Sequence, residues 1–435
     1  MAFRLHGAHV PHRKNTANMQ PERMPVPNIV KIPLSMHIGK PATALVKKGD
    51  HVDVGTLIAE ADGFVSSPIY SSVTGTVEGI EEHLLSNGAV SSAIVIDAYG
   101  EQFVCEDIAP PVIESREDLI EAIKKSGIVG LGGAGFPTFV KFATDKEVDT
   151  LVLNGAECEP YITSDSVTMV NGAEDILFAL ELLDKYFDFG QIVIGIEKNK
   201  PEAIAAMKAL ENKNAKIKVK VLPSIYPQGG EKVLVYHTID RKICDGMLPA
   251  DVGCIVCNTS TVANLGKYFK TGMPLVERTI TVDGGAVKEP KNVIAPIGTP
   301  ISDVFEFCGG FKTQPKKVIY GGPMMGITVP SLEEPVLKQT NAILALTDKE
   351  CEMPKQTACI RCGACINTCP FGIDVPAISR GYSLGDMEMI DKAGASVCME
   401  CGCCSFVCPA NRPLVQTNKL AKAALKDYKE KEASK

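Results

Sequence analysis

The chain has 435 residues, with 45 Lys plus Arg against 52 Asp plus Glu, which gives a net charge of −7. This acidic balance argues against a nucleic-acid-binding protein, which needs a basic face. Hydrophobic residues make up 45% of the chain, a share that excludes extensive disorder. No window approaches the ~18 uninterrupted apolar residues of a membrane span. The opening MAFRLHGAHVPHRK lacks the apolar stretch of a signal peptide, so we expect a cytoplasmic location.

Residues 1–28 predict an extended arm, because four prolines interrupt them. The arm carries His6, His9 and His12, whose spacing of three fits no helix face in a stretch that contains proline. A loop is therefore favoured there over a metal site.

Residues 29–110 are dense in Val, Ile, Gly and Ser, with turn sequences between short apolar runs. This pattern predicts a small all-β unit. The unit resembles the barrel-sandwich hybrid fold of biotinyl and lipoyl carrier domains, which need a lysine at a hairpin tip to carry their cofactor. No lysine occurs from Gly49 through Ile123. We therefore expect a β scaffold without a carrier function.

Residues 111–260 change character, because helical periods alternate with short β-branched runs. Such alternation predicts an α/β domain with a largely parallel sheet. The expected helices begin near Ser115 and run over 174–187 and 200–212, and the expected buried strands are 150–155, 191–197 and 217–223.

The later part of the chain divides into three expected units. Residues 261–325 show the pattern of two strands and a short helix, which indicates a small α+β module. Residues 350–415 lose the β pattern and are rich in cysteine. Residues 416–435 form a Lys-rich helical tail, for which a solvated, fraying end is favoured over docking to an acidic partner or a lipid surface.

The cysteines are concentrated, since nine of the 16 lie between Cys359 and Cys408. Residues 359–370 read CIRCGACINTCP and residues 398–409 read CMECGCCSFVCP, and both match C-x2-C-x2-C-x3-C-P. This is the bacterial ferredoxin run, in which three cysteines hold one 4Fe–4S cluster and the fourth holds the other. The stretch between the runs shows no strand alternation, so we expect a helical ferredoxin-like domain rather than a β-rich one.

The spacing assigns four thiolates to each of two clusters. The first set is Cys359, Cys362, Cys365 and Cys408, and the second set is Cys398, Cys401, Cys404 and Cys369. Two structural zinc sites are the alternative, but two full runs that end in Cys-Pro exceed what zinc needs. Cys403 is off register and is expected to be a packed neutral thiol. Cys254 and Cys257 have no second pair, so core thiols are favoured over a metal site.

Residues 127–142 read GIVGLGGAGFPTFVKF, in which Gly130, Gly132 and Gly135 satisfy G-x-G-x-x-G. The dinucleotide fingerprint should follow a strand, whereas a helix precedes this one, so the ordinary Rossmann interpretation is rejected. The glycines still let backbone N–H groups approach a phosphate. A helix is expected from about Pro137, with Lys141 one turn in and able to pair with the anion.

Two further stretches carry acidic residues in expected turns. Residues 152–165 contain Asn154, Glu157 and Glu159, and residues 225–234 contain Tyr226 and a Gly-Gly pair before Glu231. Each stretch taken alone favours a solvated acidic turn. With the glycine-rich loop, however, they resemble the NADH-binding flavoprotein subunit of respiratory complex I, which has an N-x-x-E-x-E-P turn and a Y-x-x-G-x-E segment in this order. The next motif of that flavoprotein subunit is N-N-V-x-T, and this chain matches it only at Asn258 and Thr261.

The order of the units resembles that of the C-subunit family of the Rnf complex, also called Rsx, a ferredoxin:NAD+ oxidoreductase. The 261–325 module of this chain is similar to the SLBB domain, the soluble-ligand-binding β-grasp domain, which both families contain. The resemblance implies a noncovalent FMN with NAD(H) stacked over it. It also implies a set of cofactor-binding residues: Gly130, Gly132, Gly133, Gly135, Lys141, Asn154, Glu157, Glu159, Tyr226, Gly229, Gly230, Glu231, Asn258 and Thr261.

The function implied is hydride exchange between NAD(H) and FMN, followed by one-electron steps through two 4Fe–4S clusters. No catalytic acid or base is expected. Membrane subunits would translocate ions and hold this chain at the cytoplasmic face of the membrane, and electrons would flow from ferredoxin toward NAD+. Two alternatives remain: a cobalamin reductase flavoprotein of a microcompartment, and a non-catalytic iron–sulfur electron-transfer adaptor.

Overall fold

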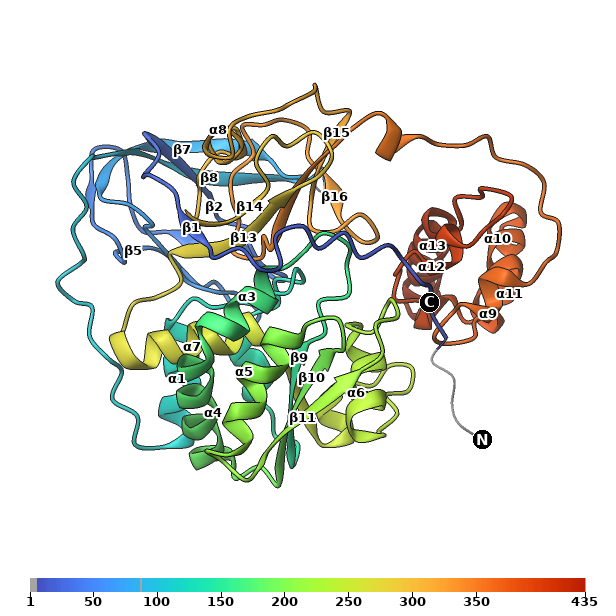
Figure 1. The fold of residues 1–435 in the computed structure, drawn as a ribbon, viewed down its shortest axis with the longest axis horizontal. Helices are drawn as coiled ribbons and strands as arrows, with labels where there is room; N and C mark the ends of the chain where they lie inside the picture. The colour runs from blue at the N-terminus through green and yellow to red at the C-terminus, as the bar shows by residue number, and fades with distance from the viewer. Residues whose placement is uncertain (1–5, 87, 435) are drawn as a thin grey trace.

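The computed structural model describes residues 6–86 and 88–434. The chain forms a β barrel, an α/β domain and a second β module that pack together, with a helical cysteine-rich unit to one side (Figure 1). The predicted multidomain α/β fold class is confirmed. The first five residues of the predicted arm, Asn87 of a predicted turn and Lys435 of the predicted tail lie outside the described residues.

The first unit consists of two small sheets that enclose a core. Its four-stranded sheet has the order β2 (Ile29–Pro33), β8 (Val90–Ala98), β7 (Gly75–Leu84) and β4 (His51–Val52). Its three-stranded sheet has the order β3 (Thr43–Ala44), β5 (Leu57–Glu60) and β6 (Ile69–Tyr70). Val30 and Ile32 alternate along β2 and face Ile96 and Ile94 of β8, and all four are fully buried.

The second unit is built on a parallel sheet, as predicted. Its strand order is β11 (Ile217–Leu222), β10 (Gln191–Glu197), β9 (Thr150–Gly155) and β12 (Cys254–Asn258). Its helices are α1 (Arg116–Lys125), α2 (Thr138–Phe142), α3 (Ser164–Asn171), α4 (Ala173–Phe187), α5 (Pro201–Glu211), α6 (Glu231–Ile239) and α7 (Thr259–Thr271). The expected strands and helices therefore form within about one residue of their predicted ends.

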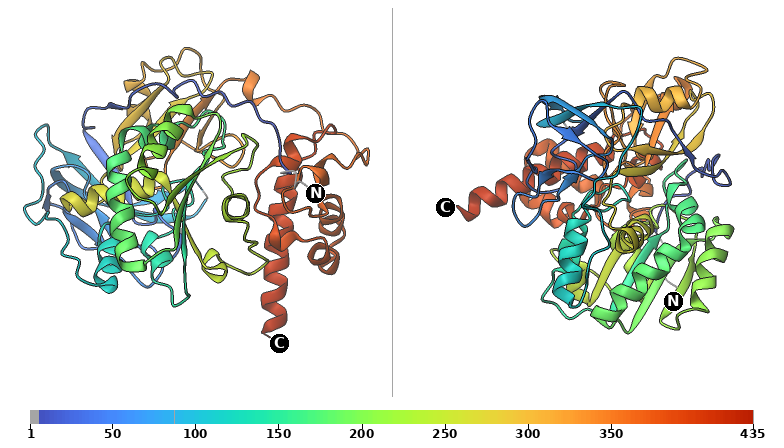
Figure 2. Two further views of the ribbon diagram at one scale, coloured as in Figure 1. Left: turned by 60° about the horizontal axis from the view of Figure 1, so that its bottom comes forward. Right: turned by 90° about the vertical axis from the view of Figure 1, so that its left-hand side faces the viewer.

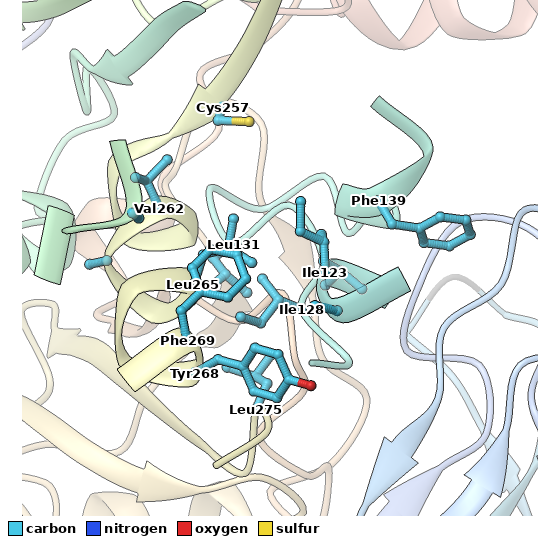
Figure 3. Close-up of a cluster of buried hydrophobic side chains, with 14 of the residues drawn as sticks. Ile123, Ile128, Leu131, Phe139, Cys257, Val262, Leu265, Tyr268, Phe269 and Leu275 are labelled. Atoms are coloured by element: carbon cyan, nitrogen blue, oxygen red, sulfur yellow. The ribbon is translucent and has the colours of Figure 1, made fainter. Parts of the chain in front are cut away.

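Local signals explain two helix starts in this unit. Ser115 caps α1, because its side chain accepts from the Asp118 amide in a complete capping box. Asn258 caps α7 by accepting from the Thr261 amide. Helix α7 packs with Leu265 and Phe269 against the apolar segment that leads into the glycine-rich loop (Figure 3). The predicted boundary at residue 260 is therefore wrong, since it cuts a helix that belongs to the α/β core.

The third unit is a six-stranded sheet with one helix, α8 (Ile301–Phe307). The strand order is β1 (Glu22–Arg23), β14 (Lys291–Pro296), β13 (Glu277–Asp283), β17 (Ala342–Leu346), β15 (Lys317–Tyr320) and β16 (Ile327–Thr328). The predicted two strands and short helix are present. The predicted end at residue 325 is too early, because β17 pairs with both β13 and β15.

The cysteine-rich unit is helical, as predicted, and no strand occurs in described residues 347–434. Its helices are α9 (Ala364–Asn367), α10 (Val375–Leu384), α11 (Met387–Lys392), α12 (Cys403–Phe406) and α13 (Leu414–Ala433). The expectation of a solvated tail from residue 416 is wrong for the first half of α13, where Asn418, Ala421 and Leu425 are buried. Only the second half projects away from the molecule (Figure 2).

One buried cation ties three units together. Lys338 is fully buried and donates to Ser67 Oγ (3.2 Å), Pro68 O and Gly127 O (2.8 Å). Ser67 and Pro68 belong to the barrel, Gly127 begins the glycine-rich segment, and Lys338 precedes β17. Burial lowers the pKa of Lys338 to about 7, while the three oxygen acceptors compensate part of the cost of burying its charge.

The substitution Lys338→Met should destabilise the fold by roughly 2 kcal/mol, because it leaves three buried oxygens without their donor. The pKa of Lys338 is lowered to about 7 on folding, so the unfolded chain binds more protons between about pH 7 and 10. Wild-type stability relative to the variant should therefore rise with pH through that window. Denaturant unfolding at several pH values measures this, with the exposed Lys47→Met as control; parallel pH profiles would contradict the prediction.

Candidate functional site

The parallel sheet has one point at which its strand order changes direction. From β9 the chain continues to β10 and β11 on one side, whereas β12 pairs with the opposite side of β9. Ligands of open α/β sheets bind at the carboxyl ends of strands at such a point. Asn154 and Asn258 lie there as register partners at the ends of β9 and β12.

The glycine-rich loop, residues 130–135, is fixed over this edge by two predicted site residues, Asn258 and Thr261, at the start of α7. Thr261 Oγ1 accepts from the Leu131 amide (3.0 Å). A Cβ on Gly132 would stand 3.0 Å from Asn258 Nδ2, so a side chain at this position would crowd that amide. Thr261 is buried and thus contributes by holding the loop.

The loop presents unused backbone donors. Gly132, Gly133 and Ala134 are exposed, and in the part of the chain that the structure describes their amides donate to no protein acceptor. Gly133 has a φ of +113° and Gly135 a φ of +66°, a region that favours glycine. Adjacent free N–H groups on a side-chain-free loop suit phosphate or carbonyl oxygens. The loop therefore fits a flavin nucleotide.

Lys141 and Glu231, which lie far apart in the sequence, meet beside the loop. Lys141 Nζ donates to Glu231 Oε1 (3.2 Å) and to Val256 O (2.8 Å). Lys141 is on α2, which begins at Thr138 close to the predicted start, and Glu231 begins α6. Both side chains are partly exposed, so the pair is accessible to a ligand.

The first acidic turn is packed rather than solvated, so that expectation is wrong for it, whereas Glu231 of the second stretch is exposed. Asn154 Nδ2 donates to Gly229 O (2.8 Å) and joins the two turns. Glu157 accepts from the Asp165 amide (2.6 Å) at the start of α3. Glu159 accepts from the amides of Met324 (3.0 Å) and Met325 (2.8 Å) in the third unit, and burial raises its pKa to about 7.

The N-terminal arm also contributes to this region through Lys14, which sequence reasoning missed. Lys14 Nζ donates to the carbonyl oxygens of Glu157 (2.9 Å) and Glu159 (2.8 Å). Burial lowers the pKa of Lys14, and the nearby Glu157 carboxylate opposes that shift. A lone lysine in a polar arm gives no signal for this role, because its partners are backbone oxygens.

Sequence reasoning likewise missed two buried charged residues next to the loop, Asp165 and Arg278. Asp165 accepts from Ser260 Oγ (2.6 Å) and Asn258 Nδ2 (2.7 Å). Arg278 donates to Leu131 O (3.0 Å) and Thr340 O (3.1 Å). Burial lowers the pKa of Arg278 to about 10, and the Asp165 charge opposes the shift. In the sequence, Arg278 is one of several polar residues in an expected strand, so nothing there marks it as buried.

Five cysteines of the two runs line one cavity in the helical unit. These are Cys369, Cys398, Cys401 and Cys404 of the predicted second set, together with the off-register Cys403. Asn418 Nδ2 lies 3.8 Å from Cys398 Sγ, to which it donates. In the other set, Cys359 and Cys362 are exposed. Burial raises the pKa of Cys365, and the charges of Cys408 and Cys359 raise it further.

The second cysteine loop lies against the Tyr226–Glu231 turn. Tyr226 is buried, and its hydroxyl donates to Cys401 O (2.7 Å). A Cβ on Gly230 would stand 2.3 Å from Met399 Cε, the end of a flexible side chain, so the two loops are in direct contact. Tyr226 thus serves the contact between domains, and the predicted flavin side of the α/β domain adjoins the predicted second cluster.

Three cysteines outside the predicted ligand sets are packed thiols. Cys403 is buried, and its Sγ lies 3.6 Å from Tyr226 O, to which it donates. Cys254 and Cys257 are buried on β12, and burial raises the pKa of Cys257 to about 11. These positions suit core thiols, as the sequence indicated.

Four family models match the chain in consecutive segments. They are the RnfC barrel sandwich hybrid domain (residues 3–101), the Nuo51 FMN-binding domain (123–267), the SLBB domain (279–328) and a 4Fe–4S dicluster domain (353–420). No helix within residues 6–86 and 88–434 is long and apolar enough to cross a membrane.

Two curated relatives are similar over most of their length. The C subunit of the proton-translocating ferredoxin:NAD+ oxidoreductase complex of Clostridium ljungdahlii is 41% identical, with 88% of this chain and 84% of that protein covered. The C subunit of the Na+-translocating complex of Acetobacterium woodii is 41% identical, with 96% and 95% covered. A crystal structure of an NAD+-reducing NiFe hydrogenase is 17% identical, with a TM-score of 0.47, and covers 72% of this chain and 54% of that one.

The fold and the site define a flavin and iron–sulfur electron-transfer protein, in which an FMN-binding domain of the Nuo51 type adjoins a 4Fe–4S dicluster domain. The cofactor prediction is confirmed at this level, and iron–sulfur rather than zinc is the metal chemistry. More narrowly, the chain belongs to the RnfC family, the C subunits of the ion-translocating Rnf complexes. The predicted resemblance is thereby confirmed.

The substitution Tyr226→Phe should weaken the contact between the two domains. It removes the hydroxyl that donates to Cys401 O and leaves that carbonyl without its partner, which costs about 1 kcal/mol. We expect faster amide hydrogen exchange across residues 398–404, measured by mass spectrometry. Tyr428→Phe, at an exposed position of α13, is the matched control; identical exchange in both variants would show that the hydroxyl does not hold the loop.

Proposed function

We propose that this chain is the subunit of an Rnf complex that binds FMN and NAD(H) for hydride exchange and holds two 4Fe–4S clusters for single-electron transfer. The observation that carries this proposal is the direct contact between the turn at Tyr226–Gly230 and the loop of Cys401. A flavin site and a cluster site in contact within one chain serve little purpose other than electron exchange. The names of the relatives, which are subunits of ferredoxin:NAD+ oxidoreductase complexes, support the same activity.

Bound FMN would supply the exchange between a two-electron hydride carrier and one-electron carriers. The chain's own contribution is binding and orientation. The free amides of Gly132, Gly133 and Ala134 would donate to FMN oxygens, and Thr261 holds the loop that carries them. Lys141 offers a cation that Glu231 partly neutralises. No side chain is assigned as a catalytic acid or base.

For the clusters we propose the ligand sets predicted from the spacing. The cavity lined by Cys369, Cys398, Cys401 and Cys404, and also by Cys403, supports one set. The other set, Cys359, Cys362, Cys365 and Cys408, rests on the spacing of the runs. Asn418, which donates to Cys398 Sγ, would stabilise that thiolate.

The remaining assignments follow from family membership. Ion translocation belongs to other subunits, and the chain reaches the membrane through those partners at its cytoplasmic face. Electrons flow from ferredoxin, through another protein of the complex, toward NAD+. The exposed first run, with Cys359 and Cys362 at the surface, suits entry of electrons from outside the chain.

Replacing one ligand should remove one cluster and spare the flavin. Cys359→Ser should lower bound iron from about eight to about four atoms per chain while NADH still bleaches the flavin absorbance. Cys403→Ser should retain all the iron, because Cys403 is off register. Cys244→Ser changes an exposed cysteine outside both runs and is the control. If a colorimetric assay found the wild-type iron content in Cys359→Ser, that result would contradict the ligand assignment.

Gly133→Val should abolish flavin binding, because a β-branched residue cannot readily adopt a φ of +113° and its side chain would cover the free amides. FMN content should fall below about a tenth of the wild-type value, and NADH-dependent dye reduction should fall with it, while iron is unchanged. Gly310→Val is the control, since Gly310 has a φ of +76° with open space around it. If the wild-type protein bound no FMN and did not reduce the dye, the interpretation as a non-catalytic electron-transfer adaptor would be favoured instead.

A further inference from the structure

The segment Gln339–Asn341, which leads into β17 of the third unit, lies directly on the glycine-rich loop. A Cβ on Gly135 would stand 3.4 Å from Gln339 Cβ and 3.5 Å from its Cγ. Asn341 Nδ2 donates to Gly132 O at 3.4 Å. The proposed FMN site is therefore bordered by a segment from a second domain, which the predicted site residues do not include.

Two buried cations fix this segment in place. Lys338, directly before Gln339, donates to Gly127 O (2.8 Å) at the start of the glycine-rich segment. Arg278 donates both to Thr340 O (3.1 Å), directly after Gln339, and to Leu131 O (3.0 Å) in the loop. Gln339 is thus held from both sides, and its position over Gly135 is preset rather than adjustable.

The carbonyl oxygen of the Gln339 side chain lacks a partner among the described residues. This oxygen, Oε1, is enclosed and, within residues 6–86 and 88–434, has no hydrogen-bond partner. An enclosed amide without a partner costs about 1–3 kcal/mol, and folded proteins pair nearly all such groups. The side chain of Gln339 lies over Gly135, which ends the loop whose Gly132 and Gly133 amides are also free. Unpaired polar groups that gather at one place indicate a polar ligand supplied from outside the chain.

We propose that Gln339 is a further FMN-binding residue, and that its carboxamide pairs with the imide edge of the flavin ring. That edge carries carbonyl oxygens beside an N–H, and a carboxamide offers one acceptor and two donors in a matching plane. The third unit thereby completes the site, and binding of the ring depends on how this unit docks on the α/β domain. This inference rests on the proposed FMN site, and it adds a residue to it.

The test compares Gln339→Leu, which keeps the volume and removes the amide, with Gln314→Leu at an exposed position of the same unit. FMN and riboflavin, which lacks the phosphate, are titrated separately into flavin-free protein while flavin fluorescence is followed. Loss of one hydrogen bond should raise the Kd of Gln339→Leu about three- to tenfold for both ligands. Bound iron should be unchanged.

Thermal unfolding of the flavin-free variants separates binding from a structural role. If the Gln339 amide stays unpaired until a ligand binds, replacing it should leave the Tm of the flavin-free protein unchanged or raise it. A lowered Tm together with an unchanged Kd would overturn the inference. A Kd raised for FMN but not for riboflavin would place the contact at the phosphate and overturn the pairing with the ring. Failure of the wild-type protein itself to bind FMN would refute the proposed function instead.

Discussion

The contact between the second cysteine loop and the Tyr226–Gly230 turn is the constraint on which electron transfer within this chain depends. Without it, the α/β domain and the helical unit would be joined by an extended connection (Figure 1) and by peripheral contacts such as Ser396 Oγ to Asp245 Oδ2 (2.9 Å). Tyr226 supplies a hydrogen bond to the Cys401 carbonyl, and Gly230 lies against Met399. Because Tyr226 belongs to the predicted flavin-site segment, one short turn serves the flavin side and the cluster side together.

Buried cations fasten the other units around the same region. These cations are Lys14 of the arm, Arg278 of the third unit and Lys338 of the segment before β17. Each donates to backbone oxygens near the glycine-rich loop or the acidic turns. Burying a charge is costly unless oxygens surround it. Each cation therefore specifies one arrangement of the units, since any other arrangement would leave its charge without acceptors.

The barrel, which lacks the lysine of carrier domains, gains a structural explanation from these contacts. The Ile38 amide donates to Gly135 O (3.0 Å), and Ser67 and Pro68 accept from Lys338. Phe64 of the barrel packs edge-on against Phe139 of α2, with ring centroids 5.9 Å apart. The fold of a cofactor carrier is thus used here as a wall that supports the flavin domain.

The sequence by itself determined the local structure and the chemistry of the cofactors. Periodicity placed β9, β10 and α4 within a residue, since such patterns depend on neighbours along the chain, and cysteine spacing identified the iron–sulfur runs because a cluster needs thiolates at fixed offsets. Only the tertiary structure decided the docking of the units, the burial of Lys338 and Arg278, the buried half of α13 and the place of Gln339. These depend on contacts between residues distant in the sequence, which periodicity and spacing do not record.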